Sequence, residues 1–482
     1  MNTLEQFLCQ SMVALTKSAP AYYNDDTRLI SCLRSLASGL NWGDHASSAF
    51  ARIIPEASRV IVKPNFVLDD NQGPWTFDAV ITHSSIVRTV VRELLLTPAS
   101  QISVGDAPVQ GCDFNRLLRR TGLGEWAQDL MQREPRFTGI QDFRRTASFF
   151  KDGVRYAVEN RVPESRYSLF DLGADSLLEP VTSAEPRFRV TCYDPKFLAQ
   201  THHRGRHQYL ISRDILEADV VINLPKLKIH CKAGITNALK NLVGINGNKE
   251  YLPHRRFGGT SETGDCYPGK DPIKGLAEKL YDFRNSSNSV LRSKFVRQAV
   301  KPLNAVLKLR GEDTSLEGAW SGNDTVWRMT LDLNRILIYG RPDGSMAENP
   351  QRRVLHICDG IIAGQGRGPL SPQPFELGVI LAGDNPAAVD WVGAHLLNFD
   401  PEKIPLLAGV FAKYRWPIAS FSPSAISAIA DQTHYSPAAV RATLGLPTPE
   451  HVPAGWSSAI RKDAGGVSSI SLDEVSAESF DG

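Results

Sequence analysis

The stretch ADVVINLPKLKIHCKAGITNALKNLVG, residues 218–244, decides the class of fold. Residues 220–224, VVINL, form a short run that is apolar except for Asn223, with the length that is typical of a strand buried on both faces. After the stretch PKLKIHCKAG, residues 235–242 predict a helix that carries Lys240. A buried strand followed by a helix is the repeating unit of parallel sheets, so we predict an α/β protein.

The same alternation of strand and helix precedes this stretch. Residues 60–62 and 102–104 predict buried strands, and between them residues 84–95 have their apolar side chains at helical spacing. Strand, helix and strand in this order predict a βαβ unit. The architecture that we expect is therefore a set of mostly parallel sheets flanked by helices.

Downstream of the quoted stretch the rhythm continues. We predict strands at residues 330–333 and 354–358, and then a strand, a turn and a helix that begins near Pro386. Asp384 is the expected N-cap of that helix, and Asp390 is a candidate salt-bridge partner for one of the lysines.

A chain of 482 residues exceeds one small core, so we expect two lobes. The predicted segments are a helical N-terminal extension, a first α/β lobe with a loop-rich or antiparallel insertion, a second α/β lobe, and a C-terminal extension with a disordered end. Their bounds are 1–55, 56–215, 216–420 and 421–482.

Composition excludes several classes of function. Apolar residues make up 42% of the chain and charged residues 22%, as in a folded globular protein. The formal charge of +2, from 54 basic and 52 acidic side chains, predicts neither nucleic acid nor a membrane surface as a partner. The sequence contains no run of about 18 apolar residues, so we predict no membrane-spanning helix.

The seven cysteines are scattered and odd in number, and no two form a CxxC pair. This pattern argues against a disulfide framework and against an intrinsic iron–sulfur cluster motif. Together with an N-terminus that lacks the features of a signal peptide, it predicts a cytoplasmic location.

The densest group of chemically active side chains follows the predicted strand at 220–224. Strand ends in open α/β sheets face the ligand crevice, and cations gathered there bind carboxylate or phosphate and lower one another's pKa. The plainer interpretation is a polar loop with surface lysines and a core histidine. Their number favours a functional site composed of Lys226, Lys228, His230, Lys232, Lys240, His254 and Arg255.

Polar residues at the other predicted strand ends fit the same crevice. Lys63 follows the first strand and His83 stands at a predicted helix start, which together make a modest anion site, although a simple helix cap is the plainer alternative. Asp106 and Asp359 end two strands, where each is a candidate metal ligand or turn residue.

Glycines follow the predicted strand at 354–358. In CDGIIAGQGRGP, Gly364 and Gly366 allow backbone N–H groups to approach an oxyanion, and a plain flexible loop is the alternative. We treat them as candidate substrate-binding residues in a lid.

At this point the sequence resembles a known family. VVINLPKLKIHCKAGITNALKNLVG is very similar to the segment that characterises the domain-of-unknown-function family numbered 362, and VIVKPNF, VGDAP, LDLN, CDGIIAGQGRGP and GVILAGDNPAAVD match it as well. Many members of that family carry a ferredoxin-like domain with CxxC motifs, which this chain lacks. If this chain takes part in electron transfer, we therefore expect it to act as the partner of a separate ferredoxin.

A more remote resemblance concerns the nickel-pincer lactate racemases. In those enzymes a histidine is followed by a glycine and then by the lysine that holds the cofactor, with a second histidine downstream. His230, Gly234, Lys240 and His254 are similar in order and spacing. The resemblance implies that Lys240 is an anchor and that the two histidines move a proton, but Asn237 and Ala238 replace an expected glycine pair.

We therefore expect an enzyme that acts on a small anionic metabolite by proton or hydride transfer, as an isomerase, an epimerase or a cofactor-assisted redox enzyme. The alternatives are a metal- or cofactor-binding or maturation protein without turnover, and an electron-transfer partner. The cofactor would be a metal or a tethered nucleotide-derived group. The predicted catalytic residues are His230, Lys240, His254 and Lys228, and the predicted substrate-binding residues are Lys63, His83, Lys226, Arg255, Gly364 and Gly366.

Overall fold

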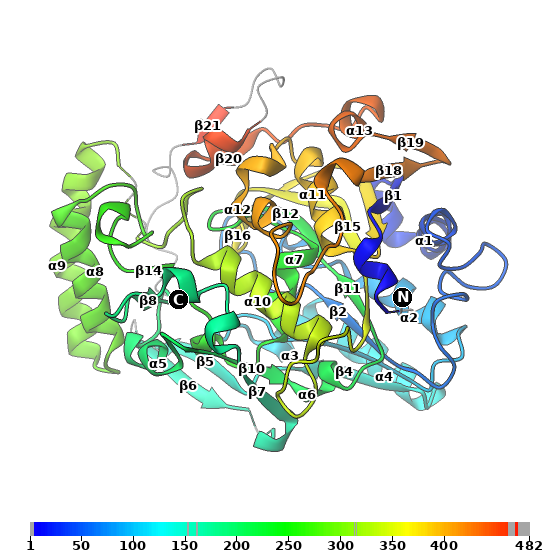
Figure 1. Ribbon diagram of the computed structural model, residues 1–482, viewed down its shortest axis with the longest axis horizontal. Coiled ribbons are helices and arrows are strands. Elements are labelled where there is room, and N and C mark those ends of the chain that lie inside the picture. The colour runs from blue at the N-terminus through cyan, green and yellow to red at the C-terminus, as the bar shows by residue number, and fades with distance from the viewer. Residues whose placement is uncertain are drawn as a thin grey trace.

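A computed structural model describes residues 4–151, 154–160, 162–312, 314, 316–460 and 468–470. Its centre is a mixed 12-stranded sheet whose main path runs β19-β18-β1-β17-β15-β11-β2-β3-β4 (Figure 1). The predicted α/β class is confirmed. In path order these strands span Thr433–Tyr435, Ser427–Ala430, Met12–Lys17, Val379–Gly383, Arg353–Arg367, Val220–Leu224, Arg59–Pro64, Gln101–Asp106 and Phe137–Asp142.

Helices cover both faces of the sheet, and each face has its own apolar core. Val60 and Val62 of β2 pack into the core that holds α1 (Asp26–Gly39) and α2 (Ser84–Leu95). Ile61 points the other way, into the core with α10 (Val326–Tyr339) and α11 (Pro386–Leu396). Because both faces are buried, the strands read as continuous apolar runs.

The central strands run parallel and in a register that aligns their carboxyl ends. Asn223 of β11 lies opposite Lys63 of β2 on one side and opposite His356 of β15 on the other. A polar row therefore crosses the sheet where the apolar cores end.

Strands from all four predicted segments join this one sheet. Residues 12–17, expected to be helical, form β1, which pairs with β17 and β18. The prediction is wrong there because the run lies between two other strands and is buried on both faces, with Val13 and Leu15 in one core and Ala14 in the other. The insertion is antiparallel, with β5 (Thr146–Lys151) on β6 (Val154–Glu159) and β7 (Tyr167–Asp171) on β10 (Arg206–Ser212). Most of the end predicted to be disordered lies outside the described residues.

Four local predictions are wrong. Residues 330–333 belong to helix α10, whose residues are buried around the whole helix, so their spacing could not separate helix from strand. The helix predicted over 235–242 is only α7 (Ala238–Asn241), because β12 (Lys226–His230) turns back through β13 (Gly234–Thr236). The N-cap of α11 is Asn385, while Asp384 accepts a hydrogen bond from Trp42. Asp390 caps α7 by accepting from the amides of Ala238 and Leu239.

The glycines predicted to lie in a lid after the strand are part of the strand itself. β15 continues to Arg367, and Gly364 and Gly366 pair there with Pro374 and Pro372 of β16 (Ser371–Phe375). A Cβ at Gly364 would lie 2.7 Å from the Cβ of Lys228, so the glycine provides close packing against β12.

The remaining elements connect or flank this sheet, and η denotes a 3-10 helix. The further helices are α3 (Phe114–Arg120), α4 (Leu123–Arg133), α5 (Pro195–Thr201), α6 (Arg213–Leu216), α8 (Pro272–Asn285), α9 (Val290–Leu309), α12 (Pro405–Gly409) and α13 (Pro437–Thr443). The further strands are β8 (Phe188–Arg189), β9 (His202–His203), β14 (Arg255–Arg256), β20 (His451–Pro453) and β21 (Ser468–Ile470).

Candidate functional site

Two buried ion pairs hold the strand ends together. Lys63 donates to Asp106 across 2.7 Å, and Lys226 donates to Asp359 across 3.0 Å. All four side chains are almost completely buried. A buried charge is tolerated only when it is paired, and each of these lysines is held by its own carboxylate. Lys63 and Lys226, predicted to bind substrate, are thus engaged within the protein.

The Lys63–Asp106 pair depends on a close approach of the chain at Gly244. Asp106 also accepts from the amide of Phe66 at 2.7 Å, and Lys63 reaches Asn241 at 3.2 Å. A Cβ at Gly244 would lie 2.1 Å from the Asp106 carboxylate oxygen and 2.6 Å from the Lys63 Nζ. The glycine after α7 therefore seals this pair, which is why it is buried.

The Lys226–Asp359 pair includes an aromatic hydroxyl and a histidine that the sequence did not connect. Tyr23 donates to Asp359 at 2.6 Å and stacks on the His83 ring, with centroids 3.8 Å apart. Burial, followed by the Asp359 charge, raises the pKa of Tyr23. Burial lowers the pKa of His83 to about 4, so this ring is neutral near pH 7. His83 caps α2 as expected, with Nδ1 accepting from the Ser85 amide.

The two predicted metal ligands do not meet. Asp106 and Asp359 each belong to a separate lysine pair, and within the described ranges no group of three or more His, Cys, Asp or Glu side chains is placed to hold a metal ion. The residues that the structure describes therefore do not fit a metal held by these two carboxylates.

Next to these pairs lies a group of lysine and histidine side chains with few acidic partners. We call it the His–Lys group: Lys228, His230, Lys232, Lys240, Lys249 and His254. β12 contributes the first two, α7 contributes Lys240, and the turn Lys249–Tyr251 contributes Lys249. Among the acids of the described chain, only Glu317 forms an ion pair with a member, Lys232, at 2.8 Å.

Burial and mutual repulsion lower the pKa values of the buried lysines Lys228, Lys240 and Lys249. The pKa of Lys240 falls to about 8 and that of Lys249 to about 7, in both cases mainly through burial. Among the described residues, Lys228 donates to two neutral oxygens, those of Asn65 at 2.8 Å and Val80. Burial lowers the pKa of Lys228, and the charges of Lys226 and Lys240 lower it further. An anion at this position would find several donors whose charge is uncompensated.

Lys240 differs from the other buried lysines. Its side chain is 9% exposed, and within the described part of the chain its amine forms no hydrogen bond or ion pair that would hold it. An amine with a pKa near 8 and no partner can bind an anion when protonated and act as a nucleophile when neutral.

The two histidines are held in opposite tautomers. The amides of Lys232 and Ala233 donate to His230 Nδ1 at 3.0 and 3.2 Å, so the neutral ring carries its proton on Nε2. His254 Nδ1 lies 2.7 Å from the carbonyl oxygen of Leu252, which can only accept, so His254 Nε2 is left with a lone pair. One ring can donate a proton and the other can accept one.

Burial, followed by Lys240, lowers the pKa of both histidines well below the usual value. His254 itself contributes to the lowering at His230, so the rings are close enough to interact. Both are therefore neutral near pH 7, which preserves the donor and acceptor roles that the tautomers define.

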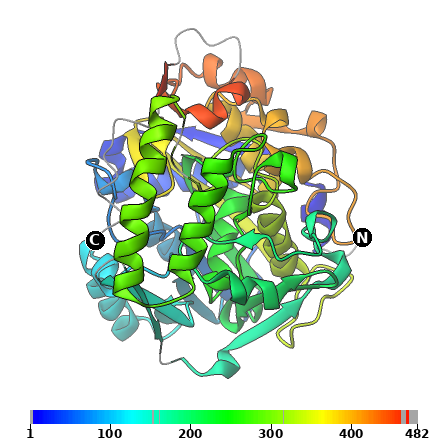
Figure 2. The same ribbon diagram turned by 90° about the vertical axis from the view of Figure 1, so that its left-hand side faces the viewer.

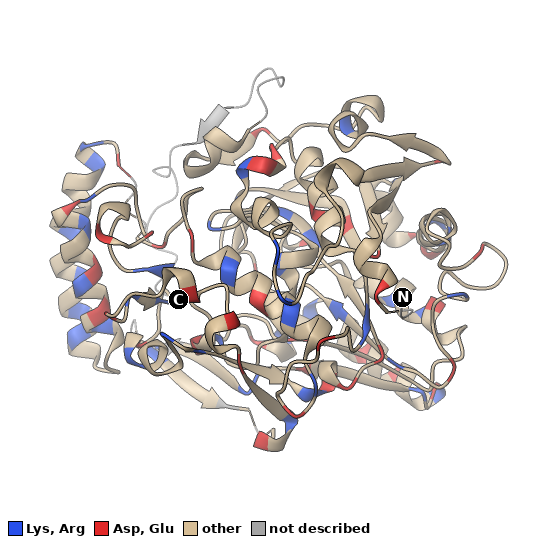
Figure 3. Cartoon of the chain, viewed as in Figure 1, with Lys and Arg blue, Asp and Glu red and all other residues tan. Residues whose placement is uncertain are grey.

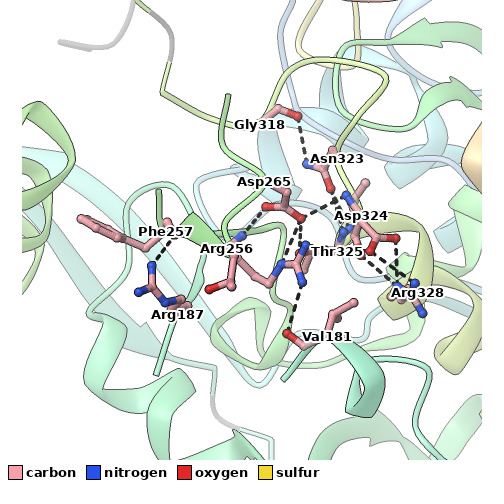
Figure 4. A network of polar contacts seen from close by, with 12 residues as sticks. Val181, Arg187, Arg256, Phe257, Asp265, Gly318, Asn323, Asp324, Thr325 and Arg328 are labelled. Carbon is pink, nitrogen blue, oxygen red and sulfur yellow. Dashed lines mark hydrogen bonds and ion pairs between the residues drawn. The ribbon is translucent and has the colours of Figure 1, made fainter. Parts of the chain in front are cut away.

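Figure 4 shows a polar network around Asp265, Asn323 and Thr325, and this network also fixes the backbone of His254. Asn323 donates to the carbonyl oxygens of His254 and Gly318, both at 2.9 Å, and its own oxygen accepts from the first amides of α10. Asp265 accepts hydrogen bonds from the Arg256 amide and from the Thr325 hydroxyl, at 2.5 Å each. It therefore links Arg256, two residues after His254, to the start of α10. The histidine is thus positioned by a rigid element.

Arg255 does not reach the His–Lys group. It is buried and forms an ion pair with Glu278 of α8. Lys249, in contrast, lies in the group but was missed by the sequence reasoning. Lys249, in the run NGNKEY, belongs to no recognisable motif. Its position shortly before His254 in the sequence is the one signal that was available.

Comparisons with known proteins agree with the sequence resemblance. A thylakoid-associated protein of Synechocystis sp. is 27% identical over 203 residues, which are 41% of this chain and 38% of that protein. The match thus spans well under half of that relative's length.

Two solved structures resemble this chain weakly. A Thermotoga maritima protein gives a TM-score of 0.29 at 9% identity, over 74% of this chain and 54% of that one. The lactate racemase apoprotein from Thermoanaerobacterium thermosaccharolyticum gives 0.30 at 11% identity, over 82% and 58%.

A family model matches residues 60–146 and 181–395, which include β3, β11, β12, β15, the His–Lys group and all of β2 except its first residue. This is more than half of the chain, and it covers every strand end that carries a charged residue of the site. The chain belongs to the family described as domain of unknown function (DUF362).

Proposed function

We propose that the protein is an enzyme that moves a proton at a carbon atom of a small anionic metabolite, as an isomerase or epimerase. The observation that carries the proposal is the pair of neutral histidines in opposite tautomers beside Lys240. An acid and a base that remain distinct near neutral pH are what reversible proton transfer requires.

The cations supply the substrate class. Lys240, Lys249 and Lys228 have no carboxylate partner among the described residues, so a carboxylate or phosphate of the substrate would replace the missing counter-charge. Negative charge that develops when a proton leaves a carbon next to a carboxylate would be stabilised by the same amines.

The proton steps balance without a redox partner. His254 Nε2 would take the proton from carbon and become an imidazolium, and the electron pair would move toward the bound carboxylate. His230 Nε2–H would return a proton to the carbon and become an imidazolate. The two rings would then exchange protons with water before the next turnover.

The experiment is hydrogen exchange in heavy water. Small carboxylates, beginning with 2-hydroxy acids, are incubated with the protein in D2O, and loss of the C–H signal is followed by proton NMR. We expect exchange that is abolished in His254→Gln and in His230→Gln and that is unchanged in His45→Gln, which alters an exposed histidine. Exchange that persists in both site variants would refute the assignment of acid and base.

A second candidate is a protein that carries a group tethered to Lys240 without turnover. It is favoured by one observation, the partnerless amine with a pKa of about 8. The residues fit such a group, since Lys240 would form the bond and Lys249 and Lys228 would face its negative charges. Intact mass of the protein purified from its own host tests this: added mass on the Lys240 peptide supports it, and an unmodified mass contradicts it.

A further inference from the structure

A helical hairpin stands at one side of the molecule, away from the sheet. α8 and α9 pack against each other and lie side by side in both ribbon views (Figures 1 and 2). Their inner sides are buried on a small core around Cys266, Tyr267 and Ala277. The outer sides have no covering element in the described structure.

The outer sides are unusually apolar. Of the twelve large hydrophobic side chains that are exposed among the described residues, six lie on these two helices. In α9, Leu291, Phe295, Val306 and Leu309 fall on one side of the helix at spacings close to whole turns. Leu291 is 80% and Leu309 88% exposed. Leu276 and Phe283 extend the surface on α8. An exposed apolar stripe of this kind is unfavourable in water and is typical of a surface that contacts a partner or a membrane.

The charge beside this stripe has one sign. α9 contains five basic residues and no acidic one, while Arg310, which follows its last residue, pairs with Asp271 at the start of α8. Blue segments lie along the hairpin in Figure 3. The two acidic residues of α8 both turn toward the body of the protein: Glu278 pairs with Arg255 and Asp282 with Arg189. The basic residues that flank the stripe on α9 are Lys294, Arg297, Lys301 and Lys308.

Exposed leucine and phenylalanine flanked by lysine and arginine match the two layers of an anionic bilayer surface. The apolar side chains enter the acyl boundary while the basic ones contact lipid phosphates. We propose that the α8–α9 hairpin docks on membranes that contain anionic lipids. The net charge of the whole chain predicted no membrane partner, because it averages this local cluster against acidic residues elsewhere.

Docking by the hairpin does not require insertion of a helix across the bilayer. None of the helices in the described ranges combines the length and the apolar character needed to span one. The attachment is therefore peripheral and depends on salt, since the lysines and arginines act at the headgroup level.

The test uses the full chain and sedimentation with vesicles of phosphatidylcholine, with and without phosphatidylglycerol. We expect binding only when phosphatidylglycerol is present, weakened by added salt. Lys294→Gln with Lys301→Gln should reduce binding by roughly five-fold per charge. Leu291→Ser with Phe295→Ser should reduce it further at any salt concentration.

Matched controls separate the hairpin from general stickiness. Leu96→Ser removes a leucine that is 58% exposed elsewhere, and Lys413→Gln removes an exposed lysine; neither should change binding. Circular dichroism confirms that each variant is folded. Absence of binding, equal binding to both vesicle types, or hairpin variants that bind like the controls would overturn the proposal. A dimer in solution that Phe295→Ser breaks would assign the face to a second copy instead.

Discussion

Replacing Lys240 with methionine should stabilise the protein while removing its anion site. Methionine has a similar volume and no charge, and the Lys240 amine has no partner in the described structure to be left unsatisfied. The change therefore removes the cost of burying an ammonium group and little else.

The size of the effect follows from the pKa. Lys240 has a pKa of about 8 in the folded protein against an ordinary value of 10.5, and each pKa unit is worth about 1.36 kcal/mol. The free energy of unfolding of the wild-type chain at pH 7 is thus lower by about 3 kcal/mol than that of a chain without this amine. Because the folded pKa is lowered, the unfolded state binds more protons between about pH 8 and 10.5, and the wild-type stability rises across that window.

The assay is urea denaturation of both proteins at several pH values, with Lys196→Met as a control at an exposed lysine. The difference in free energy of unfolding between Lys240→Met and wild type should be about 3 kcal/mol at pH 7 and should shrink toward zero near pH 10.5. A difference that does not change with pH, or a variant less stable than wild type at pH 7, would refute the reasoning.

Three further perturbations test the surroundings of the site by the free energy of unfolding. Asp106→Asn leaves Lys63 buried without a counter-charge and should cost about 3–5 kcal/mol, measured in urea. Gly244→Ala places a methyl group against the same pair and should destabilise by about 1–3 kcal/mol, whereas no loss would mean that the loop shifts freely. Asn323→Ala removes the cap of α10 and the bond to the His254 carbonyl, so we expect a cost of about 1–2 kcal/mol together with slower carbon–hydrogen exchange. An unchanged exchange rate would remove Asn323 from the positioning of His254.

Much of the fold follows from local pattern, and the failures have a physical cause. Strands β2, β3 and β11 are short, almost wholly apolar runs, and helix α2 has a strong helical period, so all four could be predicted. α10 is buried on all sides, so its apolar residues carry no period that separates helix from strand. β1 depends on partners at residues 379–383 and 427–430, which a local pattern cannot reveal.

The site shows the same division. The location of His230, Lys240 and His254 near one another could be inferred from their order after a strand. The pairing of Lys63 with Asp106 could not, because it depends on the register of β2 and β3 and on the space left by Gly244. Lys249 joins the group only through the turn that returns the chain to α7, and no spacing rule covers such a turn.

The most direct test of the central claim is whether a small anion brings protons with it into the His–Lys group. Calorimetric titration of oxalate at about pH 7.5, in buffers with different heats of ionisation, gives the number of protons exchanged on binding. Because an anion raises the pKa values of Lys240 and Lys249 from about 8 and about 7, we predict net proton uptake that is reduced in Lys240→Met. Binding without proton uptake, or uptake unchanged in Lys240→Met, would contradict the account.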